Sequence, residues 1–213
     1  LAAIGEVGLD FWVVKNEKDR ELQQEIFSGF IALAREMDLP LNVHSRSAGR
    51  PAIGLLLKSS AARVQLHAFD GRASTALPAV DAGYFFSVPP SVVRSRQKQK
   101  LVKQLPLSCL LVETDSPVLG PEPGVRNEPS TLARAVQAIA EIKSLQLQAV
   151  MEAVAANTTR LYGALLGVGL GLEAPSPCLG CAALRPRPRL AERQVLLVVV
   201  NDRDDAAVGE EAG

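Results

Sequence analysis

One pattern recurs along the first three-quarters of the chain: a short apolar run, a polar residue at its end, then a stretch with helical periodicity. We expect strands at five such runs, residues 2–7, 41–44, 63–67, 84–88 and 109–113. The runs are almost continuously apolar, which is typical of parallel strands in a sheet buried on both faces. Strands and helices that alternate in this way build either an open doubly wound sheet or a (β/α) barrel.

Helical periodicity fills the intervals between the strands. The longest helix is expected over residues 17–37, where large apolar residues recur on one face: Leu22, Ile26, Phe30, Leu33 and Met37. Further helices are expected at residues 51–59, 73–82, 91–104, 130–143 and 147–156, followed by a turn at 157–162. The sequence therefore predicts one α/β domain over residues 1–163.

The composition changes after Gly163. Residues 164–213 are rich in Gly, Pro, Ala and Arg and show no sustained periodicity, apart from a short apolar run at residues 195–200. We expect a low-order, irregular tail rather than a second domain. Its Cys178-x-x-Cys181 pair has no second pair and no following His, so we do not expect a zinc knuckle there.

Charge and hydropathy narrow the class of function. The chain has 23 Lys and Arg against 23 Asp and Glu, so no overall field attracts nucleic acid and any such contact must be a local patch. No apolar run reaches the roughly 18 residues of a membrane-spanning helix, and we expect no membrane partner. Three Cys fit a reducing compartment, which predicts an intracellular protein of the cytoplasm or nucleus. Because the first residue is Leu, the sequence gives no information about a targeting segment.

Both histidines of the chain stand at the ends of expected strands, His44 in LNVHSR and His67 in VQLHAFDG. Glu6 has the same place in the first strand, and Asp115 follows the fifth. Taken singly, each is more often a hydrogen-bonded structural residue or a helix cap than a ligand. The carboxyl ends of parallel strands meet at one pole, however, so we expect the four side chains to lie together. Two imidazoles and two carboxylates match the ligand set of Zn²⁺, Mn²⁺ and related divalent ions.

Arg46 and Asp10 near these residues have two interpretations each, and the neighbouring glycines have one. Arg46, two residues past His44, either contacts a phosphate or forms a salt bridge at the rim. Asp10 either orients a ligand or begins a turn, and we favour the turn. The glycines on either side of Glu6, Gly5 and Gly8, indicate that something lies close to the backbone there.

The stretch RSRQKQKLVK, residues 94–103, holds five Lys or Arg. It could contact a phosphate backbone, but we favour the solvated face of a helix, because no aromatic residues are interleaved to stack on bases. Phe69 and the aromatic residues at 84–86 could stack on a base, although Phe in a strand is usually part of the core.

Six motifs in register resemble the TatD family of metal-dependent deoxyribonucleases, which are TIM-barrel hydrolases. They are GEVGLDF, LPLNVHSR, HAFDG, LLVETDSP, RNEPS and ANTTRLYG, at residues 5–11, 39–46, 67–71, 110–117, 126–130 and 156–163. The resemblance covers residues 1–163 and implies a TIM-type (β/α) barrel that hydrolyses DNA phosphodiester bonds through a metal-activated water.

The resemblance also implies a role for each strand-end residue. Glu6 corresponds to a carboxylate that bridges two metal ions. His44 and His67 correspond to the imidazole ligands of the second ion. Asp115 corresponds to the carboxylate that binds the first ion and accepts a proton from the bridging water. The implied cofactors are two divalent ions, Zn²⁺, Mg²⁺ or Mn²⁺. The implied partner is DNA, with Arg46 as the candidate contact to its phosphates.

The family pattern has a His-x-His strand ahead of its GE-x-GLD motif, whereas this sequence holds no His before His44. We therefore expect an incomplete barrel that lacks its N-terminal strands. We also expect impaired cleavage, with at most one ion held well. The alternative is a catalytically inactive remnant that binds nucleic acid or protein.

Overall fold

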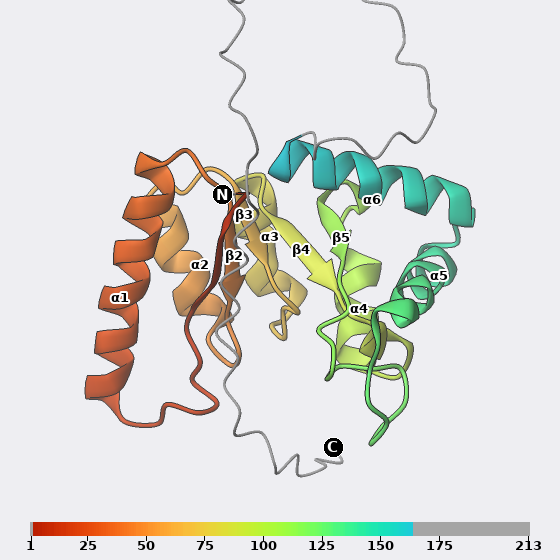
Figure 1. Ribbon diagram of the computed structural model, residues 1–213, viewed down its shortest axis with the longest axis horizontal. Coiled ribbons are helices and arrows are strands. Elements are labelled where there is room, and N and C mark those ends of the chain that lie inside the picture. Colours follow the sequence, from red (N-terminus) through yellow and green to blue (C-terminus); the bar gives the residue numbers. More distant parts are fainter. Residues whose placement is uncertain (1, 164–213) are drawn as a thin grey trace, which may run out of the picture.

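Five parallel strands form one sheet, and they are arranged in the order in which they occur along the chain (Figure 1). They are β1 (Ile4–Gly8), β2 (Leu41–His44), β3 (Val64–Leu66), β4 (Phe85–Val88) and β5 (Leu110–Val112). A doubly wound sheet reverses its strand order part-way, whereas a (β/α) barrel adds each strand beside the last. The sequential order therefore identifies a segment of a barrel. This computed structural model describes residues 2–163, so the tail predicted at 164–213 lies outside the described residues.

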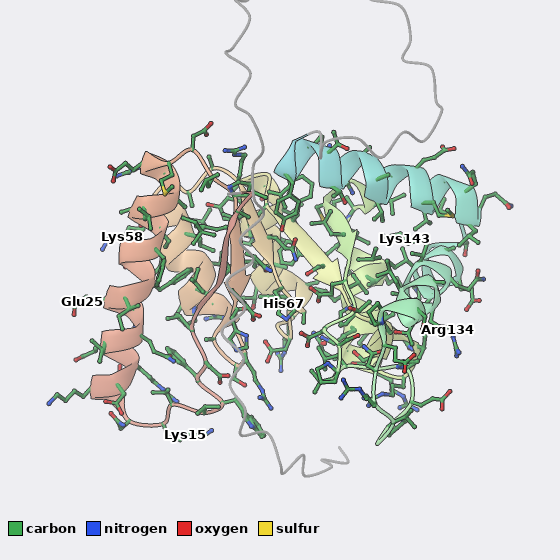
Figure 2. The ribbon with its side chains drawn as sticks, viewed as in Figure 1. Lys15, Glu25, Lys58, His67, Arg134 and Lys143 are labelled. Atoms are coloured by element: carbon green, nitrogen blue, oxygen red, sulfur yellow. The ribbon has the colours of Figure 1, made fainter. Side chains whose placement is uncertain are left out.

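Helices follow the strands at the predicted places. They are α1 (Glu17–Glu36), α2 (Gly49–Lys58), α3 (Ala73–Asp81), α4 (Arg96–Gln104), α5 (Leu132–Lys143) and α6 (Leu147–Tyr162), with 3₁₀ turns at Pro90–Val93, Leu107–Cys109 and Pro129–Thr131. Charged side chains such as Glu25, Lys58 and Arg134 point away from the sheet (Figure 2).

Two helices differ from the prediction by more than one or two residues at an end. The helix expected at 91–104 is divided, because Ser95 has an extended backbone and its hydroxyl accepts a hydrogen bond from the Lys98 amide, which starts α4. The turn expected at 157–162 is the end of α6. There the Thr158 and Thr159 hydroxyls donate to carbonyls one turn back, so these polar residues are satisfied within the helix.

Helix α1 turns a different face to the sheet from the one predicted. Its buried residues are Phe27, Ile31 and Ala34. The expected apolar face is 36–53% exposed: Leu22, Ile26, Phe30, Leu33 and Met37. The helix has apolar residues on two adjacent faces, so the periodicity correctly identified a helix but could not determine which face meets the sheet.

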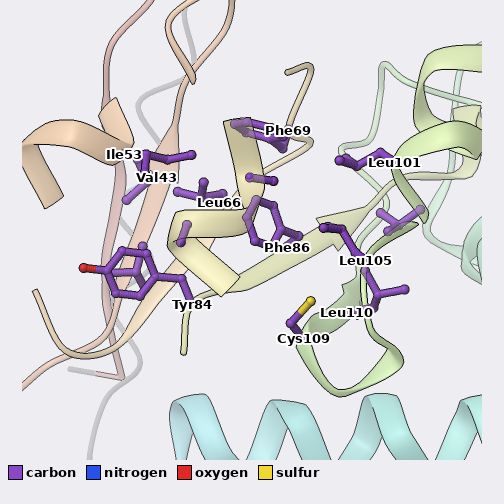
Figure 3. Packing of buried hydrophobic residues seen from close by; sticks show 14 of the residues in the cluster. Val43, Ile53, Leu66, Phe69, Tyr84, Phe86, Leu101, Leu105, Cys109 and Leu110 are labelled. Atoms are coloured by element: carbon purple, nitrogen blue, oxygen red, sulfur yellow. The ribbon is translucent and has the colours of Figure 1, made fainter. Parts of the chain in front are cut away.

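The two faces of the sheet also differ in polarity. Alternate strand side chains point to opposite faces. One set joins the helices in the main core: Leu41, Val43, Val64, Leu66, Phe86, Val88 and Leu110 (Figure 3). The other set includes the polar residues Asn42, Gln65 and Ser87, beside Phe85 and Leu111, which pack against Leu161. Gln65, Ser87, Phe85 and Leu111 are nonetheless buried, so the expected burial on both faces is confirmed for β3 and β4, although the second face is more polar than the first.

Asn157 ties α6 to the start of β5. Its side chain is buried, and its Nδ2 donates to the carbonyls of Leu107 at 2.9 Å and Leu110 at 2.7 Å. These bonds hold α6 across the end of the sheet at which the strands begin, the end that carries the N-terminus (Figure 1).

Replacing Asn157 with Ala should lower the free energy of unfolding by about 2 kcal/mol, because the buried Leu110 carbonyl and the partly buried Leu107 carbonyl each lose an amide donor. Urea denaturation measures the change. Gln148→Ala is the matched control, since within residues 2–163 that exposed amide on the same helix donates only to Glu152, and its loss should cost less than about 0.5 kcal/mol. Equal effects of the two substitutions would contradict the assigned role of Asn157.

Candidate metal and substrate site

The structure brings the four predicted residues together at the carboxyl ends of the strands. Glu6 lies in β1, His44 ends β2, His67 follows β3 and Asp115 follows β5. His67 Nε2 lies 3.3 Å from Asp115 Oδ1 and 3.7 Å from Glu6 Oε1, and Glu6 Oε1 lies 2.6 Å from His44 Nδ1. Figure 2 shows His67 near the centre of the molecule, at this end of the strands.

The glycines beside Glu6 let β1 approach β2 very closely. A Cβ atom on Gly5 would lie 2.6 Å from Asn42 Cβ, and one on Gly8, whose φ is +150°, would lie 2.0 Å from the His44 carbonyl oxygen. The neighbour that the glycines predicted is thus the adjacent strand. The register of β1 on β2 also shifts between Ile4 and Val7, as in a β-bulge, which re-aims the side chains between them. Glu6 lies in this interval.

His44 is held between two carboxylates. Its Nδ1 lies 2.6 Å from Glu6 Oε1 and its Nε2 lies 3.0 Å from Asp10 Oδ2. Burial lowers the pKa of His44, but the bonds and charges of Glu6 and Asp10 outweigh it and raise the pKa. The turn favoured for Asp10 is confirmed: its Oδ1 accepts the backbone N–H groups of Trp12 at 2.8 Å and Val13 at 2.9 Å after β1.

Glu113 is a site residue that the sequence analysis missed. Its carboxylate accepts from His67 Nδ1 at 2.6 Å, from the Ala68 N–H at 2.9 Å and from the Ser87 hydroxyl at 2.5 Å. The signal was present in LLVETDSP, because Glu113 occupies the first position past β5 and stands two residues before Asp115.

His67 therefore faces carboxylates on both sides of its ring. Burial lowers its pKa, but hydrogen bonds to Asp115 and Glu113 and the charges of Glu113 and Glu6 raise it to about 11. An imidazole with a carboxylate at each nitrogen donates from both only when it is protonated. In the described geometry, protons on the imidazoles thus compensate the carboxylates.

A hydrogen-bonded chain connects Glu113 with α6. Ser87 Oγ accepts from Gln65 Nε2 at 2.9 Å, and Gln65 Oε1 accepts from the Tyr162 hydroxyl at 2.6 Å. Burial and the charge of Glu113 raise the pKa of Tyr162 to about 12, which keeps this hydroxyl a donor. The chain fixes the orientation of Glu113 and, through it, of His67.

The basic stretch at 94–103 is only partly a solvated face. Arg96, Lys100 and Lys103 are exposed, as expected. Lys98 instead turns inward, where its Nζ donates to the Ala68 carbonyl at 2.9 Å. Burial lowers the pKa of Lys98, opposed by the charges of Glu113, Asp70 and Asp115. Lys98 thus supports the loop that carries His67.

The RNEPS motif holds the loop that follows Asp115. Asn127 is buried, and its Nδ2 donates to the carbonyls of Thr114 at 2.5 Å and Val118 at 2.8 Å. A shallow depression next to this loop is lined by Ser116, Pro117 and residues 126–130.

The donor types fit a divalent cation, but the described geometry is not a preformed metal site. Within residues 2–163, no three His, Cys, Asp or Glu side chains are placed to hold an ion directly. The imidazoles and carboxylates pair with one another instead, and metal binding would displace their protons. The residues that could hold an ion are Glu6, His44, His67 and Asp115, with Asp10 and Glu113 orienting the two imidazoles.

Carboxylates and imidazoles at the carboxyl ends of sequentially ordered parallel strands are typical of (β/α) barrels that build their sites at this pole. Residues 1–163 match the family of TatD-related DNases, and the chain belongs to this family. None of the helices in residues 2–163 has the length and apolarity needed to cross a membrane.

The chain is 52% identical over 164 residues to the deoxyribonuclease TATDN3 of Homo sapiens and to the putative deoxyribonuclease TATDN3 of Mus musculus. It spans 60% and 56% of those two relatives, which in turn match 76% of this chain. The crystal structure of the TatD homologue YjjV of Escherichia coli is similar, with a TM-score of 0.70 and 28% identity over 76% of this chain and 64% of that one. The chain thus spans about three-fifths of the length of these relatives.

In metal-free protein, the His67 imidazole should remain protonated well above neutral pH. NMR titration can follow it directly, because His44 and His67 are the only histidines. Glu113→Gln should lower the pKa of His67, whereas Glu128→Gln, an exposed control, should not. A pKa of His67 near 6.5 in the unaltered chain would contradict the pairing.

The same pairing predicts the direction of a pH effect on stability. The folded-state pKa of His67 lies above its ordinary value, so its contribution is complete below about pH 6.5 and is lost as the pH rises toward 11. Urea denaturation across this range should show a steeper loss for the unaltered chain than for His67→Gln. Equal pH dependence of the free energy of unfolding in the two chains would contradict a stabilising role for protonated His67.

Proposed function

We propose that this chain is a metal-dependent hydrolase that cleaves DNA phosphodiester bonds at the strand-end site. The observation that carries the proposal is the approach of His67 Nε2 to both Asp115 and Glu6, at 3.3 and 3.7 Å. Neighbouring ligands of a tetrahedral zinc ion are about 3.4 Å apart, so both pairwise distances are close to this value, although the three side chains do not surround a common point in the described geometry. The names of the human and mouse relatives favour DNA as the substrate.

The ligand set favours one well-held ion. Glu6, His44, His67 and Asp115 supply the donors, and catalytic sites commonly use three protein ligands with one open position. A bound divalent ion lowers the pKa of a water molecule and stabilises negative charge on a phosphoryl group. Zn²⁺, Mg²⁺ and Mn²⁺ are all compatible with mixed imidazole and carboxylate donors.

Residues of the chain would orient the ligands, accept the proton and contact the substrate. Asp10 and Glu113 fix the ring orientation of His44 and His67. Asp115, on the loop after β5, accepts a proton from the attacking water, because its Oδ1 points toward the same space as Glu6 and His67 Nε2. Arg46, which makes no salt bridge within residues 2–163, contacts a DNA phosphate.

A second candidate is nucleic-acid binding without cleavage. It is favoured by the pairing of both imidazoles with carboxylates, which leaves the donors engaged with one another. The two candidates differ in whether a divalent ion binds at these residues and makes the chain cleave DNA.

Cleavage of single-stranded and duplex DNA by the purified chain should require added Mg²⁺, Mn²⁺ or Zn²⁺ and stop with a chelator. Glu6→Gln should reduce the rate by about 100-fold or more, because it removes a charged donor from the site. Glu36→Gln, an exposed position on α1, is the matched control and should retain full activity. Absence of metal-dependent cleavage, or equal rates for the two variants, would contradict the hydrolase proposal and favour nucleic-acid binding without cleavage.

Glu113→Gln should weaken metal binding by about 10- to 100-fold, because the imidazole it orients loses its carboxylate partner. Calorimetric titration with Zn²⁺ measures this without any substrate. Ser116→Ala, in the loop after Asp115, should bind with unchanged affinity. An equal affinity of Glu113→Gln and the unaltered chain would show that Glu113 does not orient a ligand.

A further inference from the structure

The only tryptophan of the chain, Trp12, is exposed on the loop that follows β1. Its side chain retains 48% of its surface exposed, although burying an aromatic ring of this size is strongly favourable. The aromatic residues that the sequence suggested as base-stacking candidates are buried instead: Phe69, Tyr84, Phe85 and Phe86. Trp12 is thus better exposed for stacking on a nucleobase than any of those four residues.

Two cations lie against the Trp12 ring. The guanidinium carbon of Arg46 is 5.2 Å from the ring centroid and the Lys15 Nζ is 5.1 Å from it. Neither cation forms a salt bridge with a carboxylate in the part of the chain that the structure describes. An aromatic face beside unneutralised cations is the combination with which proteins hold single-stranded nucleic acid.

Trp12 is connected to the strand-end site by two short contacts. Its backbone N–H donates to Asp10 Oδ1 at 2.8 Å, and Asp10 Oδ2 lies 3.0 Å from His44 Nε2. The backbone of Phe11 also donates to the Arg46 carbonyl at 3.0 Å, which joins the loop after β1 to the loop after β2. The exposed ring therefore has a defined position relative to His44.

We propose that Trp12, Arg46 and Lys15 form a stacking site for one unpaired nucleobase of a DNA strand, next to the nucleotide at the strand-end residues. The indole stacks on the base, and the two cations contact the flanking phosphates. The proposal rests on the proposed function for the identity of the strand as DNA. It predicts a preference for single-stranded or locally unpaired DNA, because a base within a duplex does not present its face.

The test uses the fluorescence of the full chain, in which Trp12 is the only tryptophan. The probe is single-stranded oligothymidine, in buffer with a chelator, so that neither cleavage nor a metal ion affects the signal. Titration should quench the Trp12 emission with saturation. An oligomer of the same length built from abasic residues should not quench it, because it has phosphates but no bases.

Variants separate stacking from general charge attraction, with binding followed by the anisotropy of a labelled oligothymidine. Trp12→Ala should weaken binding by at least about fivefold, Trp12→Phe should retain most of the affinity, and Val13→Ala should change it less than twofold. Thermal melting checks that each variant is folded, and we expect no change because Trp12 and Val13 are exposed.

Absence of quenching, equal quenching by the abasic oligomer, or equal affinities of Trp12→Ala and Val13→Ala would each overturn the stacking site. The result is independent of catalysis. Quenching without metal-dependent cleavage would leave the stacking site standing and reject the hydrolase. Metal-dependent cleavage without quenching would support the hydrolase and reject the stacking site.

Discussion

The pairing of imidazoles with carboxylates at the strand ends is the interaction on which this pole of the molecule depends. Parallel strands all end at one edge, so their terminal polar residues are forced into a small space. Four carboxylates gather there: Glu6, Asp10, Glu113 and Asp115. Without a compensating positive charge they would repel one another, and His44 and His67 supply that charge as protons. A divalent ion could supply the positive charge instead of these protons. The same residues would then both stabilise the cluster and hold the ion.

The sequence predicted the framework of this arrangement well. Apolar runs located all five strands, and the polar residue at each strand end identified Glu6, His44 and His67 as neighbours, although the strands lie far apart in the chain. Parallel pairing explains this success, because it aligns strand ends whatever the length of the connecting helices.

Other features could not be predicted because they depend on long-range contacts. The apolar pattern of α1 fits two faces, and only the packing of Phe27 and Ile31 on the sheet decides between them. Likewise, Lys98 is one of five similar cations in its stretch, and its inward position follows from a contact 30 residues away, with the Ala68 carbonyl. Glu113 had a sequence signal, but its role became clear only from three bonds to separate elements.

The loop after β1 joins this cluster to the proposed stacking site. Asp10 contacts His44 with one oxygen and fixes the backbone of Trp12 with the other, so a single carboxylate links an imidazole to an exposed aromatic ring. The cluster and the ring both lie within residues 1–163, the part of the chain that matches the TatD-related DNases.

Both the proposed chemistry and the compensation of charge at this pole depend on a divalent ion binding among these strand-end residues. Anomalous diffraction from crystals of the chain soaked in Mn²⁺ tests it most directly. We expect one strong peak within about 2.5 Å of donor atoms from Glu6, His67 and Asp115, with the imidazoles still held by Asp10 and Glu113. An absence of anomalous density at these residues, or a peak only elsewhere on the chain, would contradict the account.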